Sequence, residues 1–489
     1  MANQQAKSLG QNLFSGVLAL LGTRLPAFVG IIFLARISGV RGLGLFTIAA
    51  SFTALSNLAM SDTSITTSAV KSCNQDVGQC SHYLSLMPAF CGALSLLILI
   101  MNVFCGEYFY HNQPLVRDTI ILLAISFFLQ GITAGYRWYF KAIRCLNYES
   151  RLNWIVAGIG LIFSVMFLLW LHDVRGYALG LVLGSAVGFF YVLITVRKLS
   201  GQSLMRVKLN WQSVRSIMCE SWPYVATTFV IAATWNIGPL ILGHWKGMVA
   251  VGGYGAVLRL STLLRSACYV LLGAWFPLLA NQFQFNIAGF RRGLALAWLI
   301  FTWLGALIMS FLWFNSSWIL SWIFGPHFAR DGTVLLLMVL AVWFSFFASI
   351  MGTALIAQNR VMSILWAAIL GLLVQFLACC LLIPEFSAAG ASVAAIMTEG
   401  FLVFYYGIKF RHLWFTLEHK WMQSGFKSLF ALFLAVPIAR SIPILIYPWR
   451  GFISVFLFVG LSWSLRIMPK NIWHELLSSL RDRGTFVAV

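Results

Sequence analysis

The sequence has 489 residues, of which 60% are hydrophobic and only 9% are charged. This composition excludes a large soluble core and is typical of a polytopic membrane protein. The formal net charge of +20 does not indicate a nucleic-acid partner, because the basic residues stand singly among apolar segments and form no basic stripe.

Fourteen apolar windows along the chain are long enough to cross about 30 Å of hydrocarbon. In chain order the windows cover 13–36, 43–69, 83–105, 119–143, 152–172, 176–196, 221–243, 252–279, 293–315, 332–357, 363–383, 389–408, 428–447 and 451–468. They predict an all-α polytopic membrane protein with about 14 transmembrane helices. The last two windows are the weakest, because Pro437, Pro443 and Pro448 interrupt them.

The basic residues between the windows predict the orientation of the chain. With the N-terminus inside, the cytoplasmic segments hold about three times as many Lys and Arg residues as the segments on the opposite side. Basic residues are retained on the cytoplasmic side of membranes, so this bias predicts that both termini are cytoplasmic.

A pattern that occurs twice predicts an internal duplication. The segments SGVRGLGLFTIAASF, from Ser38, and KGMVAVGGYGAVLRL, from Lys246, share two glycines and an aromatic residue at the same spacing. The same offset carries the third and fifth windows to the starts of the ninth and eleventh. An even number of spans per repeat predicts two six-helix halves of the same orientation. The predicted divisions are an N-terminal six-helix lobe at 1–196, a basic cytoplasmic linker at 197–218, a C-terminal six-helix lobe at 219–410, and two further helices with a cytoplasmic tail at 411–489.

Arginines inside the windows are the most informative residues, because an arginine at the centre of a membrane helix costs about 2.5–3.5 kcal/mol. Such charges are easiest to hold where water or counterions solvate them. We predict that they line a cavity and bind an anionic substrate, since the guanidinium fork donates two parallel hydrogen bonds. The predicted substrate-binding residues are Arg24, Arg137, Arg259 and Arg265. For Arg137, snorkelling to the nearby interface is the alternative interpretation.

Few acidic residues are available to neutralise these arginines, and the candidates are Asp62, Glu220 and Glu399. Glu399, in the middle of its window, is predicted either to pair with an arginine or to take part in ion coupling or gating. Asp62, near an interface, is predicted to cap or gate a helix. Pro26 removes a backbone donor, so we expect it to act as a hinge in the first helix, with a kink of no function as the alternative.

The motifs of soluble enzymes are absent from the sequence, among them G-x4-G-K-[ST], H-E-x-x-H and G-x-S-x-G. None of the nine cysteines has the spacing of a metal site. We therefore expect no catalysis, no cofactor and no bound metal.

Several short motifs resemble those of the polysaccharide-type flippases of the multidrug/oligosaccharidyl-lipid/polysaccharide exporter superfamily. The resemblance covers roughly residues 8–410 and depends on the order and spacing of the motifs. The motifs are the openings Gly39–Phe46 and Gly247–Tyr254, the stretch Leu58–Val70, Ala274–Leu279 (AWFPLL) and Ala354–Arg360 (ALIAQNR).

This resemblance implies a V-shaped pair of helix bundles, alternating access and a cationic cavity. It implies a flippase that translocates an undecaprenyl-diphosphate-linked oligosaccharide, the repeat unit of an O-antigen, capsule or exopolysaccharide, across the bacterial inner membrane. A polysaccharide polymerase and a chain-length regulator are the partners implied beside the lipid bilayer. The alternatives are a lipid II flippase and a cation-coupled multidrug exporter of the same fold, which would depend on Glu399 or Asp62.

Overall fold

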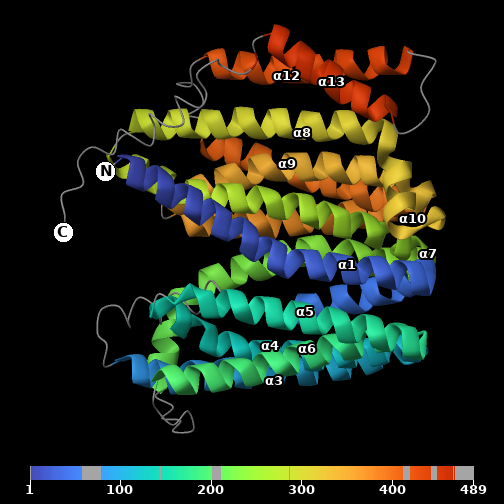
Figure 1. Cartoon of the computed structure of the whole chain (residues 1–489). Coiled ribbons are helices and arrows are strands. Elements are labelled where there is room, and N and C mark those ends of the chain that lie inside the picture. Colours follow the sequence, from blue (N-terminus) through green and yellow to red (C-terminus); the bar gives the residue numbers. More distant parts are fainter. Residues whose placement is uncertain are drawn as a thin grey trace. The chain divides into compact units, whose positions relative to one another are not determined.

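The structure is a computed structural model, and it describes residues 2–57, 79–143, 145–200, 211–285, 287–358, 360–410, 419–441, 449–465 and 467. Every regular element in these residues is helical (Figure 1). In chain order the elements are α1 (Ala2–Asn57), α3 (Gln79–Tyr110), α4 (Pro114–Ala142), α5 (Leu146–Leu171), α6 (Val174–Ser200), α7 (Trp211–Phe285), α8 (Ile287–Phe324), the 3-10 helix η2 (Pro326–Asp331), α9 (Gly332–Ala357), α10 (Val361–Lys409), α12 (His419–Ser441) and α13 (Trp449–Ser464). Asp62 and the stretch Leu58–Val70 lie outside the described residues.

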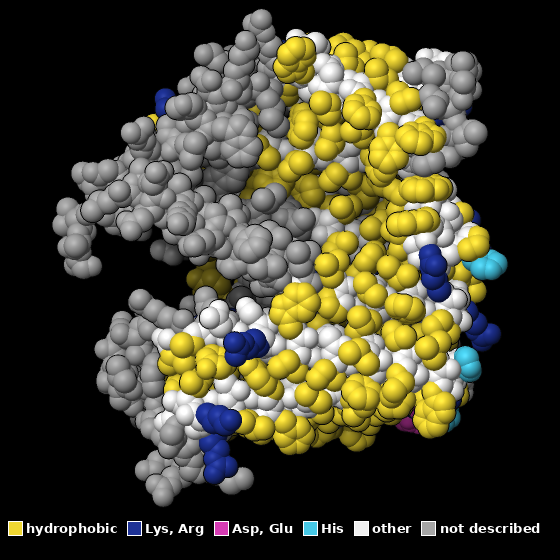
Figure 2. All heavy atoms as spheres, in the orientation of Figure 1, with side chains coloured by type: hydrophobic (Ala, Val, Ile, Leu, Met, Phe, Trp, Pro, Cys, Tyr) yellow, Lys and Arg dark blue, Asp and Glu magenta, His cyan; other side chains and the backbone are white. Residues whose placement is uncertain are grey.

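The described helices are those of a multi-pass membrane protein. Nine stretches of them are long and apolar enough to cross a membrane, and two shorter apolar stretches lie on α12 and α13. Hydrophobic side chains cover most of the described face in Figure 2, and the few visible Lys, Arg and His side chains lie mostly toward its edges. The predicted all-α membrane fold is confirmed. Each of the fourteen windows lies at least partly on a described helix, but the number of complete crossings stays a prediction.

Three long helices each hold two windows that are separated by a residue with non-helical backbone. These residues are Gly39 (φ 66°) in α1, Gly247 (φ 77°) in α7 and Ser387 (φ 52°) in α10. A positive φ is accessible to glycine because it has no Cβ atom. Gly39 and Gly247 are each the second residue of the repeated segment, so the chain breaks at equivalent places, as the predicted duplication requires.

The chain forms two compact units. Unit 1 consists of Met1–Leu18, Val257–Ala367 and Ser392–Val489, and unit 2 consists of Ala19–Ala256 and Ala368–Ala391. The predicted lobe boundaries at 196 and 218 stay predictions.

In unit 2 the two repeated segments meet at a close crossing. A Cβ atom added to Gly44 would overlap the carbonyl oxygen of Met248, and one added to Gly252 would overlap that of Val40. Gly44 and Gly252 are equivalent in the repeat, and so are Val40 and Met248, so the two contacts are reciprocal. We call this pair of contacts the glycine crossing. Membrane helices approach this closely where small residues meet, because van der Waals packing drives their association.

The remaining helices of unit 2 pack through small and polar residues. Gly176, Gly180 and Gly184 lie one turn apart on α6, and each faces the backbone of α5. The hydroxyl groups of Ser126 on α4 and Ser185 on α6 are 2.8 Å apart, which links α4 to α6. These contacts hold α4, α5 and α6 together without a hydrophobic driving force, as expected in lipid.

In unit 1 the last two helices pack on α8, as Figure 1 shows. The rings of Trp303 and Phe458 lie 5.9 Å apart, and those of Phe311 and Phe452 lie 5.2 Å apart. Gly451 of α13 lies directly against the buried Asn315 of α8. Helices α12 and α13 are therefore an integral part of unit 1.

The glycine crossing generates the first prediction. Ordinarily Gly→Ala within a helix stabilises by about 0.5–1 kcal/mol. We expect Gly44→Ala and Gly252→Ala to do the opposite and to lower the free energy of unfolding by about 1–3 kcal/mol, because the new methyl group overlaps a backbone carbonyl. Unfolding of the purified protein in detergent measures this effect. Gly158→Ala is the matched control, since its Cβ would enter open space on α5; equal behaviour of all three variants would contradict the crossing.

Candidate functional site

The four arginines predicted to bind substrate lie on three helices. Arg24 is on α1 and Arg137 on α4, both in unit 2, whereas Arg259 and Arg265 are on the part of α7 that belongs to unit 1. The side chain of Arg24 is exposed and the other three are half-buried. That the four bind one head group together stays a prediction.

Arg265 lies on a polar stripe of α7. Thr262, Arg265 and Tyr269 are three and four residues apart and therefore share one face of the helix. The Arg265 Nη2 atom donates a hydrogen bond of 3.2 Å to the Tyr269 hydroxyl, and its guanidinium carbon lies 5.6 Å from the centroid of the same ring. Tyr269 thus holds the guanidinium group in place by a hydrogen bond and a cation–π contact.

Glu399 on α10 is an acidic group close enough to Arg265 to interact with it electrostatically. Its side chain is only 5% exposed, and it interacts electrostatically with Arg265. A buried carboxylate is costly unless an opposite charge is close, and such attraction is strong where water is excluded. Pairing with an arginine and a role in ion coupling or gating both stay predictions for Glu399.

Tyr406 extends this pair along α10. It lies seven residues after Glu399, which places both on the same face, and it interacts electrostatically with Glu399 and with Tyr269. Tyr406 is 5% exposed and packs with Phe290 of α8 and Met351 of α9. We call Arg265, Tyr269, Glu399 and Tyr406 the Arg265–Glu399 site; all four belong to unit 1.

Arg259 does not belong to this stripe. It lies six residues before Arg265, which at 3.6 residues per turn places it about 120° around the helix. The two α7 arginines therefore present their side chains on different faces, and only Arg265 shares a face with Tyr269.

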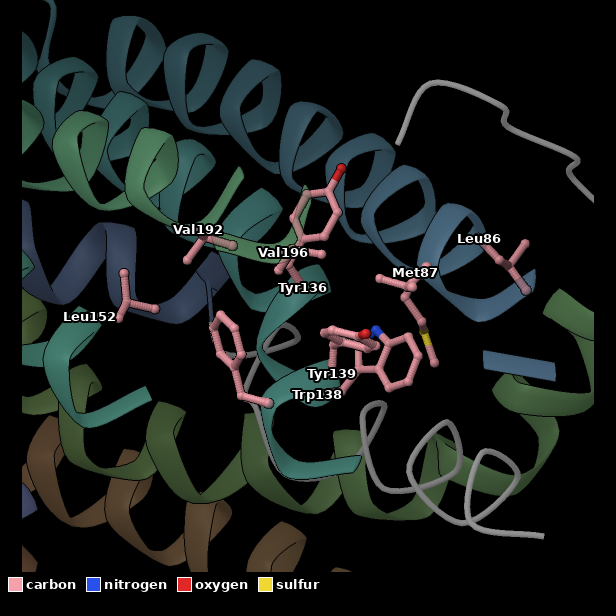
Figure 3. Close-up of a cluster of buried hydrophobic side chains, with 10 residues drawn as sticks. Leu86, Met87, Tyr136, Trp138, Tyr139, Leu152, Val192 and Val196 are labelled. Atoms are coloured by element: carbon pink, nitrogen blue, oxygen red, sulfur yellow. The ribbon is translucent and has the colours of Figure 1, made fainter. Parts of the chain in front are cut away.

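In the sequence Arg137 stands between Tyr136 and Trp138, two residues of an aromatic cluster near one end of α4. Figure 3 shows this cluster. Its neighbours Tyr136 and Trp138 are both buried, and the rings of Trp138 and Tyr139 lie together beside Met87. Packing on both sides fixes the helix at this point, so the backbone of Arg137 is well anchored. Substrate binding and snorkelling both stay open for its side chain.

Pro26 lies inside α1, two residues after Arg24, and is half-buried. The residue of α1 with non-helical backbone dihedrals is Gly39, thirteen residues further along. The helix therefore continues through Pro26, and its role as a hinge stays a prediction.

Sequence reasoning missed the two tyrosines of the Arg265–Glu399 site. Tyr406 stands near the end of its window, where tyrosines are typical of interfacial belts, whereas Tyr269 lies well inside its window. A signal was present, since Tyr269 follows Arg265 by four residues and Tyr406 follows Glu399 by seven. Among the described residues, no group of three or more His, Cys, Asp or Glu is placed to hold a metal ion.

Comparison with known proteins gives one family match and several structural ones. The model of the polysaccharide biosynthesis protein family matches residues 9–283, which is more than half of the chain. No curated protein matches the sequence.

The fold matches solved transporters at low sequence identity. The lipid II flippase MurJ in an inward closed conformation has a TM-score of 0.76 at 13% identity, and the match covers 95% of this chain and 100% of that one. An inward-facing multidrug resistance MATE transporter of the MOP superfamily has a TM-score of 0.66 at 11% identity, covering 82% and 100%. A MOP-superfamily transporter from Pyrococcus furiosus, for which reverse polarity of the binding pocket suggests a different function, has a TM-score of 0.60 at 11% identity, covering 84% and 96%.

The Arg265–Glu399 site generates the second prediction. Arg265→Gln leaves a buried carboxylate without its arginine, and Glu399→Gln leaves the arginine without its carboxylate. We expect each variant to lower the free energy of unfolding by about 1–3 kcal/mol, and the double variant to lose clearly less than the sum. Denaturant unfolding of the four proteins in detergent measures the coupling. Additive losses, within about 0.5 kcal/mol, would show that the two groups do not interact.

Proposed function

The chain belongs to the polysaccharide biosynthesis protein family, and we propose that it is a flippase for lipid-linked oligosaccharides. It translocates an undecaprenyl-diphosphate-linked repeat unit of an O-antigen, capsule or exopolysaccharide across the bacterial inner membrane by alternating access. The anionic diphosphate is bound by arginines inside the membrane, while the lipid tail stays in the bilayer.

Family and fold together support a carrier. The family connects the chain with polysaccharide biosynthesis, and the structures that share its fold are a flippase and multidrug transporters. A polysaccharide precursor that is built on a lipid has to change leaflets before it is polymerised, and a flippase supplies that step without breaking a bond. A polymerase and a chain-length regulator are the partners proposed to act after this step.

The observation that carries the proposal is the sign of the charge inside the membrane. Four arginines lie on described spans, whereas the buried carboxylate among the described side chains is that of Glu399, which interacts electrostatically with Arg265. Even with Asp62 and Glu220 counted beside Glu399, three carboxylates do not balance four arginines, so the net charge favours an anionic ligand. Arginine suits a diphosphate in particular, because its planar fork binds phosphate oxygens in pairs and never deprotonates.

The membrane potential favours the proposed direction of transport. An inside-negative potential drives negative charge outward by about 2.3 kcal/mol per charge per 100 mV. The proposed orientation places both termini in the cytoplasm, with 197–218 as the linker between the six-helix halves, and the bias of basic residues supports it. The substrate would then enter from the cytoplasmic leaflet, where lipid-linked sugars are assembled.

A lipid II flippase is the second candidate, because the fold of MurJ covers 95% of this chain. Both candidates move a polyprenyl-diphosphate glycan, so the arginine requirement is the same and the sugar distinguishes them. The comparison of the two therefore needs cells that lack one activity or the other.

The third prediction tests the head-group assignment. In a strain that lacks its own O-antigen or capsule flippase, we expect the wild-type chain to restore surface polymer. Arg24→Ala should reduce that polymer about tenfold or more at unchanged protein level, because a charge-assisted contact to phosphate is lost, while Arg24→Lys retains part of it. The surface polymer is measured beside the amount of protein in the membrane.

Arg440→Ala is the matched control for this experiment, since Arg440 is likewise an exposed arginine of an apolar window but lies on α12 and is not among the arginines predicted to bind substrate. Full activity of Arg24→Ala would refute the binding role of Arg24. Restoration of a strain blocked in lipid II transport, with no restoration of surface polymer, would favour the second candidate.

The fourth prediction separates the flippase from a cation-coupled multidrug exporter. Cells that express the wild-type chain should export an ethidium-like cation no faster than cells with an empty vector. The interior is net positive, so a lipophilic cation is repelled. Export of the cation by the wild type, abolished by Glu399→Gln, would refute the flippase proposal and support the exporter.

A further inference from the structure

A cavity opens at one end of α4, α5 and α6 in unit 2. It has a volume of about 570 Å³, within the usual range of ligand pockets, and it is lined by Asp118, Ile121, Leu122, Leu171, Asp173, Arg175 and Leu179. None of these residues is among the intramembrane arginines or acids assigned above. We call this cavity the α4–α6 pocket.

The pocket is charged at its rim and apolar further in. Ile121 and Leu122 follow Asp118 by three and four residues on α4, and Leu179 follows Arg175 by four residues on α6. Both helices begin at this end of the bundle, so the apolar residues lie about one turn deeper than the charged ones on the same face. A bilayer lipid has the same order, with a charged head group at the interface and an acyl chain below it.

Ion pairs at the rim hold the charged groups in place. Arg175 donates from Nε to Asp173 at 2.7 Å and from Nη1 to Asp118 at 3.1 Å. Arg117 donates to the other oxygen of Asp118 at 3.2 Å and to Glu107 at 3.3 Å. The side chains of Asp118, Asp173 and Arg175 are 28%, 22% and 45% exposed, so they remain accessible to a ligand.

The charge of the lining selects among lipid head groups. Two carboxylates and one guanidinium group line the pocket. With Arg117, which pairs with Asp118, and Glu107, which pairs with Arg117, the ion-pair group holds three carboxylates and two guanidinium groups, so its net charge is negative. An anionic head group is therefore disfavoured, whereas a primary ammonium group donates hydrogen bonds to both carboxylates. The phosphate beside it suits the guanidinium group of Arg175.

The surroundings of the pocket place it against lipid. Leu171, on its wall, is 43% exposed, and the adjacent Trp170 is 75% exposed. An exposed tryptophan at the end of an apolar span is typical of the membrane interface. We propose that the α4–α6 pocket binds a bilayer phospholipid with a primary amine, whose ammonium lies between Asp118 and Asp173, whose phosphate contacts Arg175, and whose acyl chain covers Leu122 and Leu179.

The test is native mass spectrometry of the full chain with phosphatidylethanolamine, phosphatidylcholine and phosphatidylglycerol at matched chain length. We expect phosphatidylethanolamine to be retained about tenfold better than phosphatidylglycerol, and better than phosphatidylcholine, which has no N–H donor. Asp118→Asn combined with Asp173→Asn should abolish the preference, and Leu179→Trp should remove retention of phosphatidylethanolamine by filling the apolar part.

Glu149→Gln is the matched control, because Glu149 of α5 is also an ion-paired carboxylate but pairs with Lys141 and does not line the pocket. It should keep the preference for phosphatidylethanolamine. Equal retention of the three lipids by the wild type, or a loss in Glu149→Gln as large as in the double aspartate variant, would overturn the proposal. If the double variant does not fold, Leu179→Trp decides, since retention that survives it places the lipid elsewhere.

Discussion

The glycine crossing in unit 2 is the constraint on which the duplicated frame depends. Neither Gly44 nor Gly252 can carry a Cβ atom, since each lies against a backbone carbonyl of the opposite repeat. A contact this close fixes distance and register together, because a shift of one residue would bring a side chain onto the carbonyl. The non-helical residues Gly39 and Gly247 stand five residues before Gly44 and Gly252. In each repeat the crossing glycine therefore follows the break in the helix at the same distance.

The arginines inside the windows do not follow the repeat that relates the helices. By the repeat offset, Arg24 corresponds to Ala232, and Arg259 corresponds to Ser51. The helices are therefore duplicated, but the arginines that would meet a substrate are not. A symmetric frame suits a carrier that has to open to either side, whereas the groups that bind a head group need to occur in one place only. Divergence after duplication could change the ligand without changing the frame.

Much of the fold followed from the sequence, since composition and window length are dictated by the bilayer. The family was predicted from short motifs in order, and the family model confirms it. The glycine pattern predicted the duplication, but the contact between its two copies depends on the tertiary structure. The electrostatic interaction between Arg265 and Glu399 could not be predicted either, because the two residues lie on helices far apart in sequence and several other arginines were equally possible neighbours of Glu399.

The α4–α6 pocket shows why short charged segments were hard to interpret. Asp118, Asp173 and Arg175 stand at the ends of windows. Isolated charges are expected there, so these residues alone do not indicate a binding site. They indicate a lipid site only together with the leucines that lie one turn deeper on two helices, which both begin at this end of the bundle. A flippase has to distinguish its substrate from the bilayer lipids that surround it. A net negative pocket would bind the amine of a bilayer lipid at the protein surface, and arginines would bind the diphosphate of the substrate inside the protein. The two classes of lipid would then be distinguished by charge.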